Sequence, residues 1–196
     1  MGDEDKVLAG GVLISYLTYE YLMLNKPAGV VSATEDRREQ TVLELITDAA
    51  RKDLFPVGRL DKDTEGLLLL TNDGALAHDL LSPKKHVDKC YYAKVRGEVT
   101  AEDVQRFADG LDIGDEKKTL PAILEILDSG SISEVKITIC EGRYHQIKRM
   151  FEAVDKEVLY LKRFSMGPLL LDETLKPGAY RRLTDKEIAQ LKERRD

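Results

Sequence analysis

The charged loop at residues 58–66 is the segment of this chain whose residue types best suit chemistry. It reads Gly-Arg-Leu-Asp-Lys-Asp-Thr-Glu-Gly and runs directly into four leucines at 67–70. That apolar run predicts a strand buried on both faces. Charges so near a core must face a cleft or pair with one another, because an unpaired buried charge is costly. A carboxylate held between basic neighbours is expected to stay ionised and could act as a nucleophile or base. On composition alone, a loop tied by local salt bridges is an equal alternative.

A second group of polar residues lies at 141–149, with the sequence Glu-Gly-Arg-Tyr-His-Gln-Ile-Lys-Arg. It joins the end of a predicted strand to an amphipathic helix predicted over 145–155. The expected buried stripe of that helix is Ile147, Met150, Phe151 and Val154. Its other face carries His145, Lys148, Arg149 and Glu152. The basic groups and the helix N-terminus would suit an anion, whereas a solvated helix face is the plainer alternative.

Two adjacent tyrosines stand in a third segment, the alternating stretch 89–96, which predicts a strand. Alternation puts Tyr91 on one face and Tyr92 on the other, where lysine and arginine accompany it. Either ring could stack on a nucleobase. The alternation alone favours Tyr92 as the exposed platform and Tyr91 as a core residue.

The elements that must position these segments are short strands and helices. Strands are predicted at 20–25, 67–70, 89–96, 122–127, 132–140 and 157–164. Besides 145–155, helices are predicted from the capping box at 41–44 to 46, from 74 to about 82, from the capping box at 100–103 to 110, and from the box at 184–187 to about 194. Several connections are too short for parallel crossovers. The pattern therefore indicates an α+β fold with a mixed, mainly antiparallel sheet flanked by helices.

The overall charge does not favour a nucleic-acid partner. The 196 residues include 30 basic and 36 acidic side chains, a formal net charge of −6, whereas nucleic-acid binders are usually basic. The basic residues nevertheless cluster at 84–89, 143–149, 162–163 and 181–182. A local basic groove on an acidic body can bind phosphates, because contact depends on local potential. Solvated faces are the alternative for each cluster.

Several classes of protein are disfavoured by missing patterns. The sequence has no apolar run long enough for a membrane span and no signal-peptide pattern, so we expect a cytoplasmic protein with no membrane partner. Cys90 and Cys140 are far apart and are expected to be free buried thiols. The three histidines are scattered and no zinc-type spacing occurs, which predicts no metal site.

Together the three polar segments resemble the RsuA-type branch of the pseudouridine synthases. The matching stretches are 23–29, 57–61 continuing through 72–74, 141–151, 167–169 and 177–181, in unbroken order over about residues 20–190. The resemblance implies two subdomains with a central catalytic cleft, and a reaction that needs neither cofactor nor metal. It implies that residues 20–196 form the catalytic domain and 1–19 a linker or remnant segment. Family members usually begin with a small S4-type RNA-binding domain, for which this N-terminal stretch is too short.

The resemblance also implies roles for individual residues. Asp61 matches the catalytic aspartate, and Lys148 matches the basic residue that pairs with it. Tyr91 matches the tyrosine that stacks on the target base, against the alternation, which favours Tyr92. Arg59 matches an arginine that contacts RNA near the flipped nucleotide. The remaining substrate-binding candidates are Arg143, His145 and Gln146.

The expected substrate is ribosomal RNA. The Tyr-His pair at 144–145 is closer to the small-subunit (16S) enzymes than to those acting on 23S rRNA, where Asn-Arg is more usual. We therefore expect a monomeric enzyme that isomerises one uridine in 16S rRNA or a small-subunit assembly intermediate. The alternatives are a 23S rRNA enzyme, a non-catalytic RNA-binding or ribosome-assembly module, and an unrelated acidic interaction protein.

Overall fold

A bent nine-stranded sheet dominates the computed structural model, which describes residues 4–9 and 12–193. Along the sheet the strands run β11-β3-β5-β9-β6-β8-β7, with β10 paired to β9 and β4 to β5. The strand bounds are β3 Tyr21–Lys26, β4 Phe55–Pro56, β5 Glu65–Thr71, β6 Lys89–Arg96, β7 Ile123–Asp128, β8 Ile132–Ile139, β9 Glu157–Met166, β10 Leu169–Leu170 and β11 Tyr180–Arg182. Every pair of these strands is antiparallel except β5–β9. The predicted mixed, mainly antiparallel sheet is confirmed.

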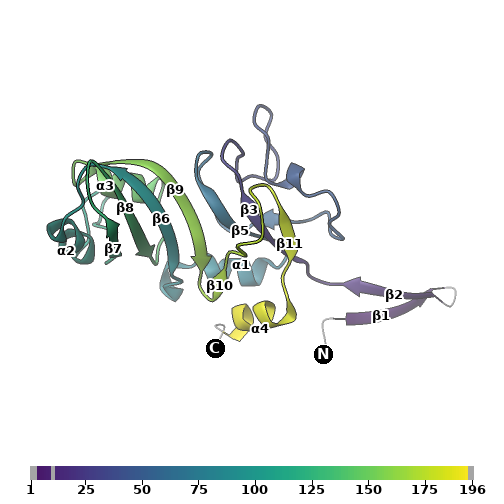
Figure 1. The fold of residues 1–196 in the computed structure, drawn as a ribbon. Helices are drawn as coiled ribbons and strands as arrows, with labels where there is room; N and C mark the ends of the chain where they lie inside the picture. The colour runs from purple at the N-terminus through teal and green to yellow at the C-terminus, as the bar shows by residue number, and fades with distance from the viewer. Residues whose placement is uncertain (1–3, 10–11, 194–196) are drawn as a thin grey trace.

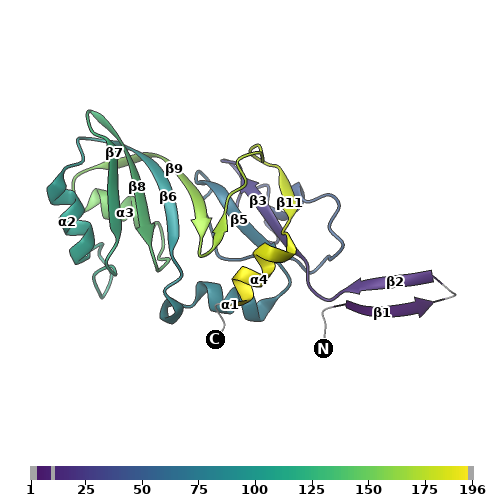
Figure 2. The ribbon, with the colours of Figure 1, turned by 60° about the horizontal axis from the view of Figure 1, so that its bottom comes forward.

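The sheet has two halves that meet at β5 and β9 (Figure 1). One half carries β6, β7 and β8 with the helices at 101–109 and 146–152, and the other carries β3 and β11 with the helices at 74–81 and 185–193 (Figure 2). The parallel β5–β9 contact spans only two residue pairs, Glu65 with Lys162 and Gly66 with Arg163. Gly66 has φ +103°, and a Cβ there would lie 2.0 Å from the carbonyl oxygen of Arg163. Only glycine permits so close an approach of the two strands. The contact between β5 and β9 therefore depends on Gly66, and it places the loop before β5 where the two halves meet.

Strand β5 is buried on both faces, as the leucine run predicts, and β3 is buried on both faces as well. Leu68 and Leu70 pack in one hydrophobic cluster with residues of β6 and β8, whereas Leu67 and Leu69 pack in a second cluster. All four are fully buried. The second cluster includes residues of helices α1 (Gly74–Leu81) and α4 (Asp185–Glu193). Strand β8 instead alternates buried and half-buried positions, as predicted for a sheet with one wet face.

The helix signals were mostly correct. Helix α1 begins after Asp73, whose side chain accepts from the amide of Leu76. Helix α2 (Ala101–Asp109) has the predicted capping box at 100–103, and residues 184–187 form the reciprocal bonds at the start of α4. Helix α3, predicted over 145–155, is shorter, at Gln146–Glu152, because His145 and Asp155 have positive φ. Its predicted buried stripe is confirmed.

The helix predicted at 41–46 was wrong. Only a single 3-10 turn forms there, Leu43–Leu45, since Thr41 is held extended by a bridge to Val31. A second 3-10 turn, Pro83–Lys85, follows α1.

The N-terminal stretch, for which the sequence predicted no element, contains an antiparallel hairpin of β1 (Glu4–Ala9) and β2 (Val12–Leu17) (Figure 1). The cysteines are free, as expected, but half-buried. In the described ranges, no helix has the length and apolar character needed to cross a membrane.

Candidate active site

A cavity of about 630 Å³ opens where the charged loop meets the end of β8, the start of α3, and strands β6 and β9. Six chain segments line it, within 31–32, 58–64, 81–83, 89–91, 139–148 and 161–163. The structure brings every predicted site residue to this cavity: Arg59, Asp61, Tyr91, Arg143, His145, Gln146 and Lys148. Tyr92 is not among the lining residues.

The carboxylate of Asp61 lies between two basic side chains from α3 and the loop before it. Lys148 Nζ is 3.2 Å from Asp61 Oδ2, and His145 Nε2 is 3.5 Å from Asp61 Oδ1. Lys148 also bonds both carboxylate oxygens of Asp63, at 2.6 and 2.9 Å. Burial acts to lower the pKa of Lys148, but the hydrogen bond to Asp63 and the charge of Asp61 hold it above its ordinary value. The lysine is therefore a permanent cation that faces Asp61.

Two buried side chains of the segment 26–32 hold the charged loop from behind. Lys26, fully buried at the end of β3, donates to the carbonyl oxygens of Thr64 (2.8 Å), Pro27 (3.0 Å) and Lys62 (3.2 Å). Ser32 Oγ donates to the carbonyl of Leu60 at 2.9 Å and accepts from its amide at 3.1 Å. These bonds fix the backbone on both sides of the catalytic candidate. Sequence reasoning gave neither residue a role, although a lysine closing an apolar strand is a signal, since buried lysines need partners.

Removal of the Lys26 ammonium should change how stability depends on pH. Burial lowers the pKa of Lys26 to about 8, although the charges of Asp63 and Asp61 act to raise it. Between about pH 8 and the ordinary value of 10.5, the unfolded chain holds a proton that the folded chain has released, so this group makes stability rise with pH there. We expect the free energy of unfolding of the wild type, minus that of Lys26→Met, to increase by about 2–3 kcal/mol from about pH 7.5 to pH 10.

Denaturant unfolding of both proteins at the two pH values checks this, because titrations common to both cancel in the difference. If this difference in unfolding free energy stayed constant with pH, the pKa of Lys26 would not be lowered in the folded protein.

The structure places the two adjacent tyrosines in different surroundings. Tyr91 is 7% exposed, lines the cavity, and has the guanidinium carbon of Arg163 6.0 Å from its ring centroid. Tyr92 lies on the other face of β6 and meets the edge of the Tyr160 ring at 6.1 Å. Burial and the Glu134 carboxylate raise the pKa of Tyr92 to about 12. Of the two, only Tyr91 could contact a molecule in the cavity.

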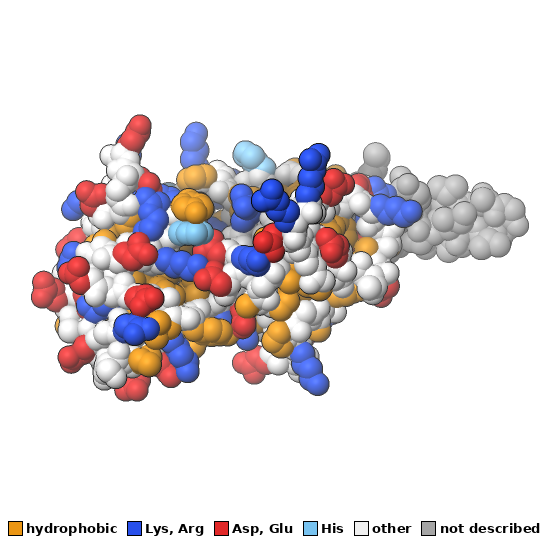
Figure 3. Space-filling view, turned by 90° about the horizontal axis from the view of Figure 1, so that it is seen from above, with side chains coloured by type: hydrophobic (Ala, Val, Ile, Leu, Met, Phe, Trp, Pro, Cys, Tyr) orange, Lys and Arg blue, Asp and Glu red, His pale blue; other side chains and the backbone are white. Residues whose placement is uncertain are grey.

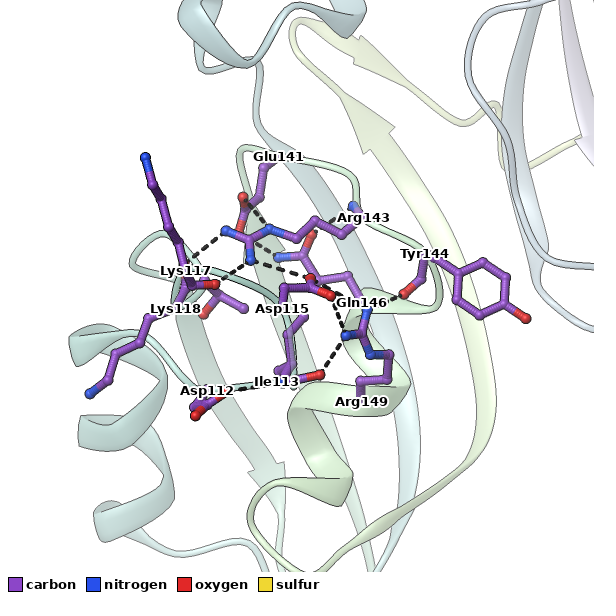
Figure 4. A network of polar contacts seen from close by, with 12 residues as sticks. Asp112, Ile113, Asp115, Lys117, Lys118, Glu141, Arg143, Tyr144, Gln146 and Arg149 are labelled. Carbon is purple, nitrogen blue, oxygen red and sulfur yellow. Dashed lines mark hydrogen bonds and ion pairs between the residues drawn. The ribbon is translucent and has the colours of Figure 1, made fainter.

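Arg143 and Gln146 brace the loop at 141–146 (Figure 4). Arg143 donates to the Glu141 carboxylate (3.0 Å) and to the carbonyls of Lys117 (2.6 Å) and Lys118 (2.8 Å). Gln146 is 4% exposed, donates to Glu141 at 2.9 Å and accepts from the backbone amide of Arg143 at 3.0 Å. The polar groups of both side chains are thus hydrogen-bonded within the protein, and these bonds hold the segment that carries His145 in place.

Asp115 joins this network from the facing loop. Its carboxylate accepts from Arg149 at 2.6 Å, and hydrogen bonds from Arg149 and then Arg143 hold its pKa below the ordinary range. Helix α3 and the loop at 112–118 are therefore fastened together (Figure 4).

Arg59 and Tyr144 also line the cavity, and their side chains are exposed. Arg59 is exposed and makes no hydrogen bond or ion pair with any residue that the structure describes. Tyr144, which sequence reasoning gave no site role, is 76% exposed and stacks on His145 with ring centroids 3.9 Å apart and planes 15° apart. Figure 4 shows its ring pointing away from the polar network. Lys and Arg side chains gather over the middle of the face drawn in Figure 3, with acidic side chains among them.

The arrangement suits nucleophilic chemistry on a flat, ring-bearing substrate. A carboxylate faces a fixed cation, and an aromatic ring lies in the same cavity to hold a base. Within residues 4–9 and 12–193, no group of three or more His, Cys, Asp or Glu side chains is arranged to hold a metal ion.

Comparisons with known proteins agree with this geometry. The family model described as RNA pseudouridylate synthase matches residues 20–153. An uncharacterized RNA pseudouridine synthase of Bacillus subtilis, YtzG, is 52% identical over 97% of this chain and 81% of its own length. Ribosomal small subunit pseudouridine synthase A of Escherichia coli is 40% identical over 96% of this chain and 81% of its own. A crystal structure of a pseudouridylate synthase superposes with a TM-score of 0.83, at 40% identity, covering 96% of this chain and 77% of that one.

The family model covers most of the segments that line the cavity, including the loop of Asp61, the strand of Tyr91 and the helix of Lys148, and ends before β9. The chain belongs to the RNA pseudouridine synthase family, in its RsuA-like branch.

Proposed function

We propose that this protein converts one uridine of ribosomal RNA to pseudouridine, that its target lies in 16S rRNA of the small subunit, and that Asp61 is the nucleophile. The observation that carries the proposal is the placement of Asp61 between Lys148 and His145 in the cavity that Tyr91 lines. The 16S target is supported by the relatives named ribosomal small subunit pseudouridine synthase A, which are 40–44% identical. The Tyr-His pair at 144–145 supports the same choice.

The target base must leave the RNA stack before it can enter the cavity. A uridine flipped from a helix or presented in an unpaired loop fits this requirement. Its ring lies against Tyr91, which holds the base while the glycosidic bond breaks. Asp61 then acts covalently on the ribose, at C1′ or through a ribose-derived intermediate. Lys148 keeps the carboxylate ionised and aimed, which is the role of a pre-organised charge.

The reaction is an isomerisation and needs no further reactant. The C1′–N1 bond breaks with its electron pair on the base, the base turns, and C5 forms the new bond to C1′. The C5 proton leaves to solvent and N1 gains one, so atoms and charge balance. Tyr91, which lines the cavity, assists removal of the C5 proton.

RNA is held outside the cavity by exposed groups. Arg59 has a free guanidinium at the rim, and the exposed side chains of Lys117 and Lys118 point away from the polar network (Figure 4). Such contacts make binding salt-dependent. Arg143 contributes by positioning the loop that carries His145.

Tyr144 supplies a stacking surface for a base next to the flipped uridine. Because the ring is exposed at the rim and already supported by His145, a base can stack on its free face. We expect Tyr144→Ala to weaken RNA binding by about 5- to 150-fold, since one aromatic–base stack is worth about 1–3 kcal/mol. Fluorescence anisotropy with a labelled small-subunit RNA fragment measures this. Tyr144→Phe should bind like the wild type, and Tyr160→Phe serves as a control away from the cavity. Unchanged affinity in Tyr144→Ala would remove the stacking role.

Tritium release from RNA labelled at C5 of uridine tests the proposed function. Free 16S rRNA, a partly assembled small subunit and 23S rRNA are supplied separately at equal uridine content. We expect release of about one tritium per molecule with a small-subunit substrate and none with 23S rRNA. Release from 23S rRNA alone would overturn the 16S assignment. Binding without release from any of the three would favour a non-catalytic RNA-binding module.

A further inference from the structure

Arg163 is a buried cation without an acidic partner. It lies on β9, is 2% exposed and lines the cavity. Its Nε donates to the carbonyl of Leu67 at 2.8 Å, while its Nη2 is buried with no hydrogen-bond partner. No carboxylate of the described residues lies within ion-pair distance of it. A guanidinium with an unpaired buried donor is costly.

A second buried cation lies nearby. Lys89, at the start of β6, is 6% exposed, lines the same cavity and donates to the carbonyl of Val87 at 3.0 Å. It also has no ion pair with the residues that the structure describes. Burial, and then the charge of Arg163, lowers the pKa of Lys89. Two buried cations in one cavity, neither with an ion pair, point to an anionic partner that is present only during function.

The position of Arg163 identifies that partner as the base. Arg163 pairs in register with Tyr91 across strands β6 and β9, and its guanidinium carbon is 6.0 Å from the Tyr91 ring centroid. A uracil lying against Tyr91 therefore stands beside the guanidinium. RNA phosphates stay at the surface, where the exposed Arg59 can meet them, whereas Arg163 and Lys89 are almost wholly buried.

We infer that Arg163, assisted by Lys89, binds the carbonyl edge of the target uracil and stabilises the negative charge that the base carries once its glycosidic bond has broken. This inference rests on the proposed function and deepens it. When the C1′–N1 bond breaks, the electron pair moves onto the uracil and delocalises over N1 and the two carbonyl oxygens. A guanidinium donor aimed at an oxygen where charge develops lowers the barrier, as in an oxyanion hole. When C5 bonds to C1′ and loses its proton, the base is neutral again after N1 is protonated.

Replacement of Arg163 should therefore slow the chemical step without lowering the affinity for RNA. We expect Arg163→Ala and Arg163→Met to lower the single-turnover rate of tritium release at saturating enzyme by about 10²–10³-fold. The dissociation constant for the RNA and its dependence on salt should stay near those of the wild type. Lys89→Met should lower the rate in the same direction. Lys162→Met is the matched control, because Lys162 is the neighbouring cation on β9 and does not line the cavity.

Chemical rescue separates this role from a structural one. Guanidinium ion at millimolar concentration should restore part of the rate of Arg163→Ala, whereas urea should not, since only the cation replaces the missing charge. Thermal melts show whether each variant is folded. If Arg163→Ala does not fold, Lys89→Met and Arg163→Met carry the test, with a fall in rate expected at unchanged affinity, whereas Arg163→Lys, which keeps the charge, should retain more of the rate.

The outcomes distinguish this inference from the proposed function. An active wild type with equally active Arg163 variants overturns the inference alone. A weaker affinity with a salt slope smaller by about one, and an unchanged rate at saturation, would make Arg163 a phosphate contact. A wild type that releases no tritium from any RNA contradicts the proposed function itself.

Discussion

Replacement of Asp61 by asparagine is expected to abolish pseudouridine formation while RNA binding persists. Asparagine keeps the shape of the side chain but removes the charge that Lys148 and His145 face at 3.2 and 3.5 Å. An amide is a far weaker nucleophile than a carboxylate, so we expect the rate to fall by at least about 10³-fold. Single-turnover tritium release gives the rate, and anisotropy gives the affinity.

The matched control is Asp63→Asn, in the same loop. Asp63 accepts both hydrogen bonds of Lys148, but its side chain is 71% exposed and is absent from the cavity lining. Replacement of Asp63 removes one negative charge, as Asp61→Asn does, but leaves the nucleophile in place. We therefore expect the rate to fall by no more than about tenfold. If Asp63→Asn were the inactive variant and Asp61→Asn kept its rate, the assignment of the nucleophile would be wrong.

The second large effect is expected at Tyr91. Tyr91→Phe keeps the ring that packs in the core and holds the base, and it removes only the hydroxyl. If the hydroxyl assists loss of the C5 proton, the rate should fall by about 10²–10⁴-fold, the range of a general acid or base. RNA affinity and the melting temperature should remain close to those of the wild type, because the ring and its buried contacts are retained.

Tyr92→Phe is the comparison that the chain itself offers. Tyr92 is the next residue on the same strand, on the face away from the cavity. We expect its replacement to leave the rate within about twofold of the wild type, in the range of an ordinary surface change. If the rate fell more in Tyr92→Phe than in Tyr91→Phe, strand alternation would have been right to favour Tyr92 as the residue that contacts the base. Equal rates in Tyr91→Phe and the wild type would limit Tyr91 to stacking.

These two tyrosines show what local pattern can and cannot predict. Alternation correctly separates Tyr91 from Tyr92, because successive side chains of a strand point to opposite faces. It does not reveal which face borders the cavity. That depends on β9 and α3, more than 50 residues later in the chain. The lysine and arginine that share the face of Tyr92 suggested RNA, but they pair with glutamates, as Lys94 does with Glu134.

The elements that the sequence predicted best are those fixed by short-range chemistry. The capping box at 100–103, the Asp73 cap and the leucine run of β5 carry their signals within a few residues. At 41–46 the side chain of Glu44 does accept from Thr41, but the bridge from Thr41 to Val31, ten residues earlier, accompanies a single 3-10 turn in place of the predicted helix.

The supporting residues of the site were hidden for a related reason. Lys26 and Arg163 bond carbonyl groups of Thr64 and Leu67, which lie 38 and 96 residues away. A hydrogen bond to a backbone carbonyl cannot be predicted from residue types, because every residue has a carbonyl group. Arg143 similarly directs its donors to carbonyls 25 and 26 residues away. Sequence reasoning therefore found the charged residues of the cavity more easily than the contacts that determine what each one does.

The most direct test of the proposed catalytic function counts tritium and pseudouridine in the same RNA. Small-subunit rRNA carrying C5-labelled uridine is incubated with the wild-type protein, and tritium release is compared with the pseudouridine found by nucleotide-resolution mapping. We predict one tritium released for each pseudouridine formed, at a single position, and neither product with Asp61→Asn. Tritium release with no new pseudouridine, or pseudouridine formed equally by Asp61→Asn, would contradict isomerisation by the carboxylate in this cavity.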